Sequence, residues 1–160
     1  QEQFKFRGVI KDVENIFREV RNYALTNKTV DNKDIISYAA FIDLSSNKID
    51  IFADTRDQAN PSNEGKKDNS DYVFKTYQIP VLYKSETYNG NNLEEKNLTL
   101  FYEPVTAKFS FKGENPGDFN GNTIGIRIYE GESSVPMREK FIIFFKNSGA
   151  PESFDSLTSL

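Results

Sequence analysis

The stretch "FRGVIKDVENIFREVRNYALTNKTV" (residues 6–30) decides the expected fold, because its apolar residues recur with the period of a helix. Spacings of i, i+3, i+4 and i+7 place these residues on one face, and the opposite face is charged or amidic. The pattern predicts an amphipathic helix from about residue 4 to 27. We expect its apolar stripe to pack on a sheet through Val9, Val13, Ile16, Phe17 and Val20.

After the helix, the pattern changes to the two-residue alternation of β-strands. "IISYAAFIDL" (35–44) and "KIDIFAD" (48–54) flank a short turn and predict a β-hairpin. "YVFKTYQIPVLY" (72–83) predicts a strand pair, or one strand interrupted at Pro80, which cannot donate to a ladder. Further strands are predicted at 98–104, 107–113, 123–130 and 140–147. The order predicts an α+β fold, with a long N-terminal helix packed on antiparallel sheet of about seven strands.

The chain is expected to form one globular domain over residues 1–147, with its strands between about residues 35 and 147. Residues 148–160 are polar and rich in turn formers, which predicts a flexible C-terminal tail. Two polar segments, 54–71 and 85–97, are predicted as loops, the first of them mobile.

Cys and His are both missing, and their absence excludes most common enzyme chemistries. The 160 residues contain no Cys and no His, so there is no thiol nucleophile, no imidazole base and no Ser-His-Asp triad. An enzyme built on carboxylates would have Glu94, Glu95 and Glu103 as its only plausible cluster, and no motif supports it. The net charge of −4 argues against a nucleic-acid partner. We therefore expect no catalytic residues and no cofactor.

Two acidic stretches raise the question of calcium. "DNSD" (68–71) and "NPGDFNGN" (115–122) offer oxygen ligands and glycine, but neither has the spacing of an EF-hand loop. Because Asn, Asp and Gly also form turns, both stretches are predicted to be turns without a metal.

Four tyrosines give a further candidate, a binding face for sugar or peptide. They are Tyr72, Tyr77, Tyr83 and Tyr88. The alternative interpretation is a packed strand edge, which period-two tyrosines form more often.

The order of these elements resembles the type IV pilin superfamily, and within it the minor pilins and the minor pseudopilins of type II secretion. The resemblance rests on "VRNYALTNKTV" feeding into "YAAFIDLSSNKIDIFAD", where Arg21, Ala24, Asn27 and Val30 match the end of the family's helix. "FYEPVTAKFSF" and the terminal "FFKNSGAPES" resemble later segments of those domains. The family's basic leader, its cleavage site and its apolar helix start are not in this sequence. We expect the chain to begin after that segment.

The resemblance implies a non-catalytic structural subunit of a cell-surface pilus or a secretion pseudopilus. Its partners would be other pilin or pseudopilin subunits, and its membrane anchor would be a segment that precedes residue 1. The domain would lie on the extracellular or periplasmic face and would be a monomer in isolation. The alternative is a secreted or lipid-anchored β-rich binding module for glycan or peptide. The start of the full-length gene would separate the two.

Overall fold

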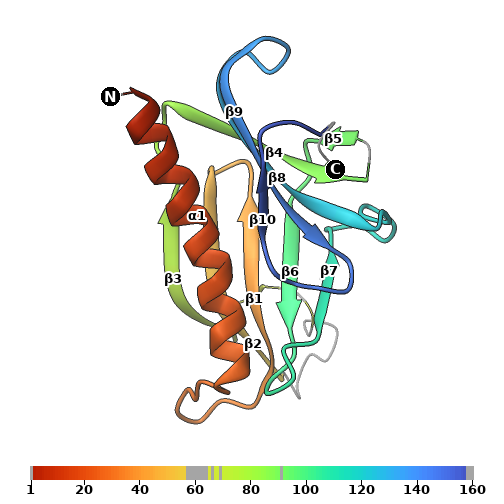
Figure 1. Ribbon diagram of the computed structural model, residues 1–160. Coiled ribbons are helices and arrows are strands. Elements are labelled where there is room, and N and C mark those ends of the chain that lie inside the picture. Colours follow the sequence, from red (N-terminus) through yellow and green to blue (C-terminus); the bar gives the residue numbers. More distant parts are fainter. Residues whose placement is uncertain (1, 57–64, 66, 69, 91, 158–160) are drawn as a thin grey trace.

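The computed structural model describes residues 2–56, 65, 67–68, 70–90 and 92–157. Within them, one helix, α1 (Glu2–Leu25), precedes ten strands (Figure 1). The strands are β1 (Ile35–Asp43), β2 (Lys48–Thr55), β3 (Tyr72–Gln78), β4 (Tyr83–Asn89), β5 (Asn92–Glu94), β6 (Leu98–Tyr102), β7 (Phe109–Lys112), β8 (Thr123–Gly131), β9 (Pro136–Phe145) and β10 (Glu152–Phe154). Most of the predicted mobile loop, 54–71, lies outside the described residues.

Helix α1 buries one stripe and exposes the other face along its length. The buried side chains are Phe6, Val9, Ile10, Val13, Ile16, Phe17, Val20 and Ala24. Their spacing is the one that a helix needs to present one apolar face. The chain leaves the helix at Asn27, which is left-handed with φ 49°, a conformation that Asn tolerates better than most residues.

The ten strands form two antiparallel sheets of five strands each. Sheet A has the order β3-β2-β1-β6-β7, and sheet B has the order β10-β9-β8-β4-β5. In sheet A, Ile42 of the central strand β1 lies opposite Ile49 of β2 and Leu98 of β6. In sheet B, Ile126 of the central strand β8 lies opposite Ile142 of β9. The inner faces of both sheets are therefore lined by apolar side chains.

This architecture corrects the predicted one. The expected α+β fold, a long helix packed on sheet of about seven strands, is wrong. The described chain is mostly β, with ten strands in two equal sheets and a single helix of 24 residues.

Three segments account for the additional strands. At 72–83, the turn that starts at Pro80 moves the chain from β3 in sheet A to β4 in sheet B, and the Tyr83 N–H donates to the Pro80 carbonyl at 2.9 Å. The predicted loop 85–97 contains most of β4 and all of β5. The predicted tail 148–160 contributes β10, which pairs with β9. Each of these short strands needs a tertiary partner, so local periodicity alone did not reveal them.

One hydrophobic core joins the helix to both sheets. Phe17 of α1 meets Phe144 of β9 edge-on, with ring centroids 4.9 Å apart. Phe144 stacks on Phe109 of β7 at 5.8 Å, and Phe109 tilts against Tyr102 of β6 at 5.3 Å. The buried Tyr102 hydroxyl donates to the Gly149 carbonyl at 2.6 Å, so its polar end is satisfied. This line of rings connects elements that are far apart in the sequence.

The close approach of β8 and β9 requires glycine at one position. A Cβ built on Gly125 would lie 2.1 Å from the carbonyl oxygen of Ile142, a backbone atom that cannot move aside without distorting the ladder. Gly125 therefore sets how tightly the centre of sheet B pairs.

Phe17 should be a main contributor to stability. We expect Phe17→Ala to lower the free energy of unfolding by about 3–5 kcal/mol, because it leaves a cavity where α1 meets sheet B. Phe4→Ala is the matched control, since the Phe4 side chain is 77% exposed and its loss should cost under about 0.5 kcal/mol. Chemical denaturation measures both values, and equal midpoints for the two variants would contradict this account of the core.

Two glycine substitutions should act with opposite signs. Gly125→Ala should lower the melting temperature because of its clash with the β9 backbone. Gly8→Ala should raise the free energy of unfolding by up to about 1 kcal/mol, because Gly8 lies in α1 and a Cβ there meets nothing within 4 Å. Thermal melts of both variants test the pair, and a rise for Gly125→Ala would show that β8 and β9 can separate freely.

Candidate functional site

The carboxylates that the sequence nominated for catalysis do not form one site. Glu94 lies in β5 of sheet B, where its carboxylate is 3.4 Å from the Lys96 ammonium. Glu103 directly follows β6 of sheet A and is exposed. Glu95 is also exposed. The carboxylates that do gather belong to other residues.

The four tyrosines do not form a common binding face. Tyr72 and Tyr77 lie on β3 of sheet A, whereas Tyr83 and Tyr88 lie on β4 of sheet B. Tyr83 and Tyr88 are buried, and the ring of Tyr83 packs on Phe6 of the helix at 5.4 Å. The change of sheet at Pro80 separates the two pairs, which the alternating sequence pattern did not reveal.

The residues that the sequence nominated for helix packing lie in the hydrophobic core. Val9, Val13, Ile16, Phe17 and Val20 are all buried there. Their surroundings are apolar, so they form part of the fold and not of a chemical site.

Three carboxylates converge where β2 ends and β3 begins. Asp54, Asp68 and Asp71 each offer an oxygen within 4.8 Å of the others, the one such group of three among the residues described. The sequence had singled out 68–71 as an acidic turn, but it gave no signal that Asp54 joins them. Asp54 ends the apolar run of β2, and its side chain is buried with the residue only 1% exposed.

One oxygen of Asp54 is fixed and the other is unpartnered. Its Oδ2 accepts from the Gly65 N–H at 2.8 Å and from the Ser37 hydroxyl at 3.5 Å. Its Oδ1 is buried and has no hydrogen-bond partner in the described part of the chain. A buried carboxylate oxygen without a donor is costly, so this atom needs an explanation.

The other two carboxylates are held in place by backbone donors. The Asp71 Oδ1 accepts from the Thr55 N–H at 2.8 Å, and its Oδ2 accepts from the Asp68 N–H at 2.9 Å. The Asp68 Oδ1 accepts from the Ser70 N–H at 2.7 Å and from the Ser70 hydroxyl at 2.6 Å. The Asp68 Oδ2 is buried and, like the Asp54 Oδ1, has no partner among the residues that the structure covers.

The electrostatics of this cluster oppose ionisation of Asp54. The pKa of Asp54 is raised from 3.8 to about 7; burial is the largest cause, and the neighbouring charges of Asp71 and Asp68 act in the same direction. The hydrogen bond from Gly65 and the positive charge of Lys112 act in the opposite direction and do not compensate. The pKa of Asp71 is also raised, chiefly by burial. Three carboxylates here carry more negative charge than their surroundings neutralise.

The second acidic stretch, 115–122, is a closed turn. The Asp118 Oδ2 accepts from the Asn115 N–H at 2.9 Å, and its Oδ1 lies 3.7 Å from the Lys96 ammonium. Its charge is paired, in contrast to the charge of the cluster at Asp54.

Sheet B carries a buried ion network that is fully paired. The Arg127 guanidinium on β8, only 4% exposed at its side chain, donates to Glu86 of β4 at 2.7 Å and to Glu139 of β9 at 2.8 Å. It also donates to the hydroxyl and carbonyl of Ser133, and it lies over the Tyr129 ring at 4.4 Å. Because Arg127 is paired with a carboxylate on each neighbouring strand, this network joins β4, β8 and β9.

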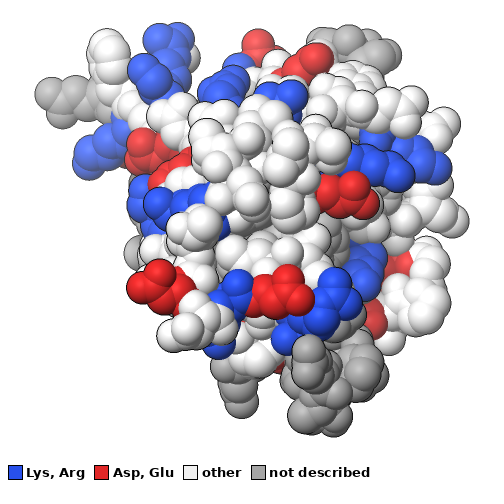
Figure 2. All heavy atoms as spheres, turned by 90° about the horizontal axis from the view of Figure 1, so that it is seen from below, with Lys and Arg blue, Asp and Glu red and all other residues white. Residues whose placement is uncertain are grey.

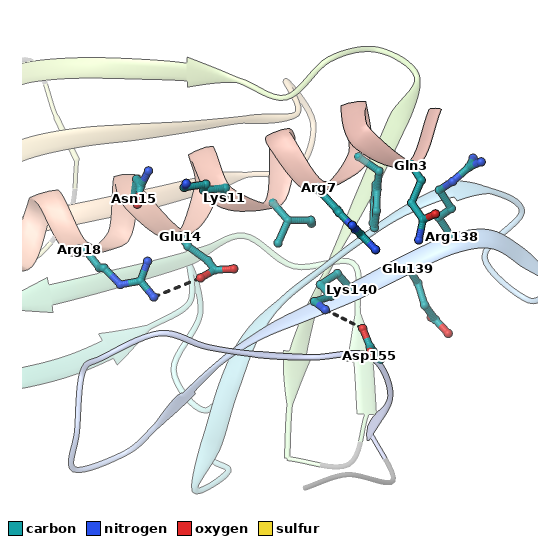
Figure 3. A pocket seen from close by; sticks show the side chains of 12 residues that line it. Gln3, Arg7, Lys11, Glu14, Asn15, Arg18, Arg138, Glu139, Lys140 and Asp155 are labelled. Carbon is teal, nitrogen blue, oxygen red and sulfur yellow. Dashed lines mark hydrogen bonds and ion pairs between the residues drawn. The ribbon is translucent and has the colours of Figure 1, made fainter. Parts of the chain in front are cut away.

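A groove runs between α1 and the β9–β10 edge of sheet B (Figure 3). The pairs Glu14–Arg18 at 3.1 Å and Lys140–Asp155 at 2.6 Å lie on its two sides. Its lining residues are Gln3, Phe6, Arg7, Ile10, Lys11, Glu14, Asn15, Arg18, Arg138, Glu139, Lys140 and Asp155.

The groove is locally basic although the chain is acidic. Five cationic side chains against three carboxylates give a local charge of +2, whereas the whole chain carries −4. Arg7 and Lys11 lie on the helix side of the groove, and neither forms an ion pair with another described residue. On the face seen from below, Figure 2 shows cationic and anionic side chains interspersed. The local charge of the groove is thus opposite in sign to the net charge of the chain.

Comparisons with protein-family models, with curated proteins and with solved structures find no match to this chain.

The pKa of Asp54 leads to a prediction about stability and pH. Because its pKa is raised from 3.8 to about 7 in the folded state, Asp54 favours folding at low pH, and this contribution falls as pH rises from about 4 to 7. The Asn side chain does not titrate, so Asp54→Asn should remove this part of the pH dependence. The measurement is the difference in unfolding free energy between the parent and the variant across that range, in buffer with a chelator. A difference that does not change with pH would show that Asp54 ionises normally.

Proposed function

We propose that the chain is a non-catalytic structural subunit of a pilus or of a secretion pseudopilus. The observation that carries this proposal is the division of α1 into two faces. One stripe is buried against the two sheets, and the other face is exposed from the first turn to the last. A helix of this kind has a free surface along its length on which neighbouring subunits can pack.

Two residues on the exposed face support a packing role. Phe4 is 77% exposed, and Gly8 follows it at i+4, so the two lie on the same side of α1. A large apolar side chain beside a position without a side chain offers a neighbouring helix both a contact and space for close approach. Gly8 has no steric role within this chain, because a Cβ there meets no atom within 4 Å.

The basic groove beside α1 supports the same proposal. Arg7 and Lys11 extend the exposed helix face with charges that have no partner within the described chain. An acidic segment of a neighbouring subunit would complement them. Charge pairs at the rim of an interface contribute to orientation and to association rate more than to affinity.

The alternative function, a binding module for glycan or peptide, rested on the four tyrosines and on the two polar segments 54–71 and 85–97, and the tyrosines no longer support it. Tyr83 and Tyr88 are buried, and the four tyrosines are divided between two sheets.

The proposal includes a location on the extracellular or periplasmic face with a membrane anchor before residue 1. No helix within the described residues is both long and apolar enough to cross a membrane. If the pilin proposal is right, the gene for the full-length protein encodes an apolar segment of about 20 residues before Gln1, the length that spans a bilayer. A lipid-attachment cysteine or a plain signal peptide in that place would contradict the proposal.

Thiol labelling tests whether the exposed helix face is covered on assembly. In the isolated 18.3 kDa domain, which should sediment as a monomer, Phe4→Cys and Glu95→Cys should label at similar rates because both positions are exposed. In the full-length protein assembled in its host, Phe4→Cys should become protected. Glu95→Cys, after β5 of sheet B, should stay reactive. Residues 1–160 contain no cysteine of their own that would interfere. Equal labelling of both positions in the full-length protein, or a stable dimer of the isolated domain, would refute this packing.

A further inference from the structure

We propose that Asp54, Asp68 and Asp71 bind a hard divalent cation, with Ca²⁺ preferred over Mg²⁺. The proposal does not depend on the function proposed above, since it concerns a site on the outer face of sheet A and not the helix surface.

The hydrogen bonds of the cluster orient the carboxylates as a set of ligands. Asp54 and Asp68 each have one oxygen fixed by donors and one buried oxygen without a partner. Asp71 is fixed through both oxygens by the N–H groups of Thr55 and Asp68. Carboxylate oxygens that already accept a hydrogen bond retain lone pairs for a metal. The arrangement therefore presents three oxygens to one point before any ligand arrives.

Nothing else in the described chain neutralises this charge. Among the described residues, the one lysine whose charge acts on Asp54 is Lys112, which reaches Gly65, where a Cβ would lie 2.3 Å from its Nζ. Its attraction to Asp54 is weaker than the repulsion from either Asp68 or Asp71. By comparison, the buried Arg127 of sheet B is paired with two carboxylates within 2.8 Å. Glu86 and Glu139 supply negative charge next to Arg127. In the same way, a divalent cation would supply positive charge next to the three carboxylates of the cluster.

The chemical type and the spacing of the ligand oxygens determine which cation the site would prefer. All three ligands are carboxylates and the chain has no Cys or His, which favours Ca²⁺ or Mg²⁺ over transition metals. Ligand oxygens up to 4.8 Å apart fit a cation with Ca–O distances of about 2.3–2.6 Å. Mg²⁺ requires shorter bonds of about 2.0–2.1 Å and near-ideal octahedral geometry, whereas Ca²⁺ accepts irregular arrangements of oxygens such as carboxylates fixed by backbone hydrogen bonds. Three protein carboxylates with water in the remaining positions predict a Kd on the order of 10⁻⁴–10⁻³ M.

A cation bound to the three carboxylates would link the end of β2 to the residues that precede β3. Asp54 is the penultimate residue of β2, Asp71 directly precedes β3, and Asp68 lies four residues before β3, so one cation would contact both strand ends. The site would thereby stabilise the outer edge of sheet A.

The experiment titrates Ca²⁺ and Mg²⁺ into chelator-treated protein. In ¹H–¹⁵N spectra, the amides of Thr55, Gly65 and Ser70 should shift first, because they donate to the carboxylates that would bind the metal. At about ten times Kd, Ca²⁺ should raise the melting temperature by roughly 3–6 °C, and Mg²⁺ at the same concentration should raise it less.

The variant Asp54→Asn distinguishes two roles for the Asp54 carboxylate, binding a metal and stabilising the fold without one. Without cation, this variant should melt at or above the parent, because the amide removes one of three like charges and its oxygen can still accept from Gly65. With Ca²⁺, it should lose the stabilisation and the amide shifts. Asp31→Asn, an exposed acid outside the cluster, is the matched control and should respond as the parent does.

Three results would overturn the proposal. One is the absence of amide shifts up to about 10 mM Ca²⁺, well above the expected Kd. Another is a Ca²⁺ response retained in Asp54→Asn. The third, an equal response to Mg²⁺, would overturn the preference for Ca²⁺.

Discussion

The contact between Phe17 and Phe144 is the interaction on which the rest of this structure depends. The two rings meet at 4.9 Å where the helix, sheet A and sheet B share one core. The apolar stripe of α1 and the inner face of each sheet all have to be shielded from water. One sheet alone is not enough to shield both the stripe and its own inner face. The helix and sheet B therefore cover the inner face of sheet A together, and the aromatic line through Phe109 and Tyr102 fixes how they fit. Because aromatic rings bury large areas and prefer tilted contacts, this line supplies both stability and a specific arrangement.

The two sheets treat buried charge in opposite ways. In sheet B, the buried Arg127 is paired with carboxylates of opposite sign, Glu86 of β4 and Glu139 of β9. In sheet A, Asp54 is just as deeply buried, but its neighbours Asp68 and Asp71 are of the same sign. Buried like charges raise one another's pKa and cost stability when ionised. In sheet B the buried Arg127 has its oppositely charged partners within the described chain. In sheet A two buried oxygens, Asp54 Oδ1 and Asp68 Oδ2, have no partner among the described residues.

Helix α1 stabilises the core with one side and presents its other side to solvent. Its buried stripe belongs to the core, and its exposed side carries Phe4, Gly8 and the unpaired charges of Arg7 and Lys11. Charged pairs elsewhere on this surface, such as Glu14–Arg18, are partnered within the chain. One side of α1 thus carries an exposed aromatic ring, a glycine and unpaired charges together, which is the basis for proposing that subunits pack there.

The sequence by itself determined the helix, its buried stripe and the hairpin of β1 and β2. These features follow from local periodicity, because a period of 3.6 or of two residues places apolar side chains on one face whatever the partner is. The sequence also excluded thiol and imidazole chemistry, since it contains no Cys or His.

Only the tertiary structure decided the division into two sheets and the composition of the carboxylate cluster. The turn at Pro80 sends neighbouring tyrosines into different sheets, and β5 and β10 are strands only because β4 and β9 pair with them. Asp54 meets Asp68 and Asp71 because the antiparallel pairing of β2 and β3 returns the chain to the same edge. Short strands and clusters of this kind depend on contacts between distant residues, and no local pattern in a single sequence records those contacts.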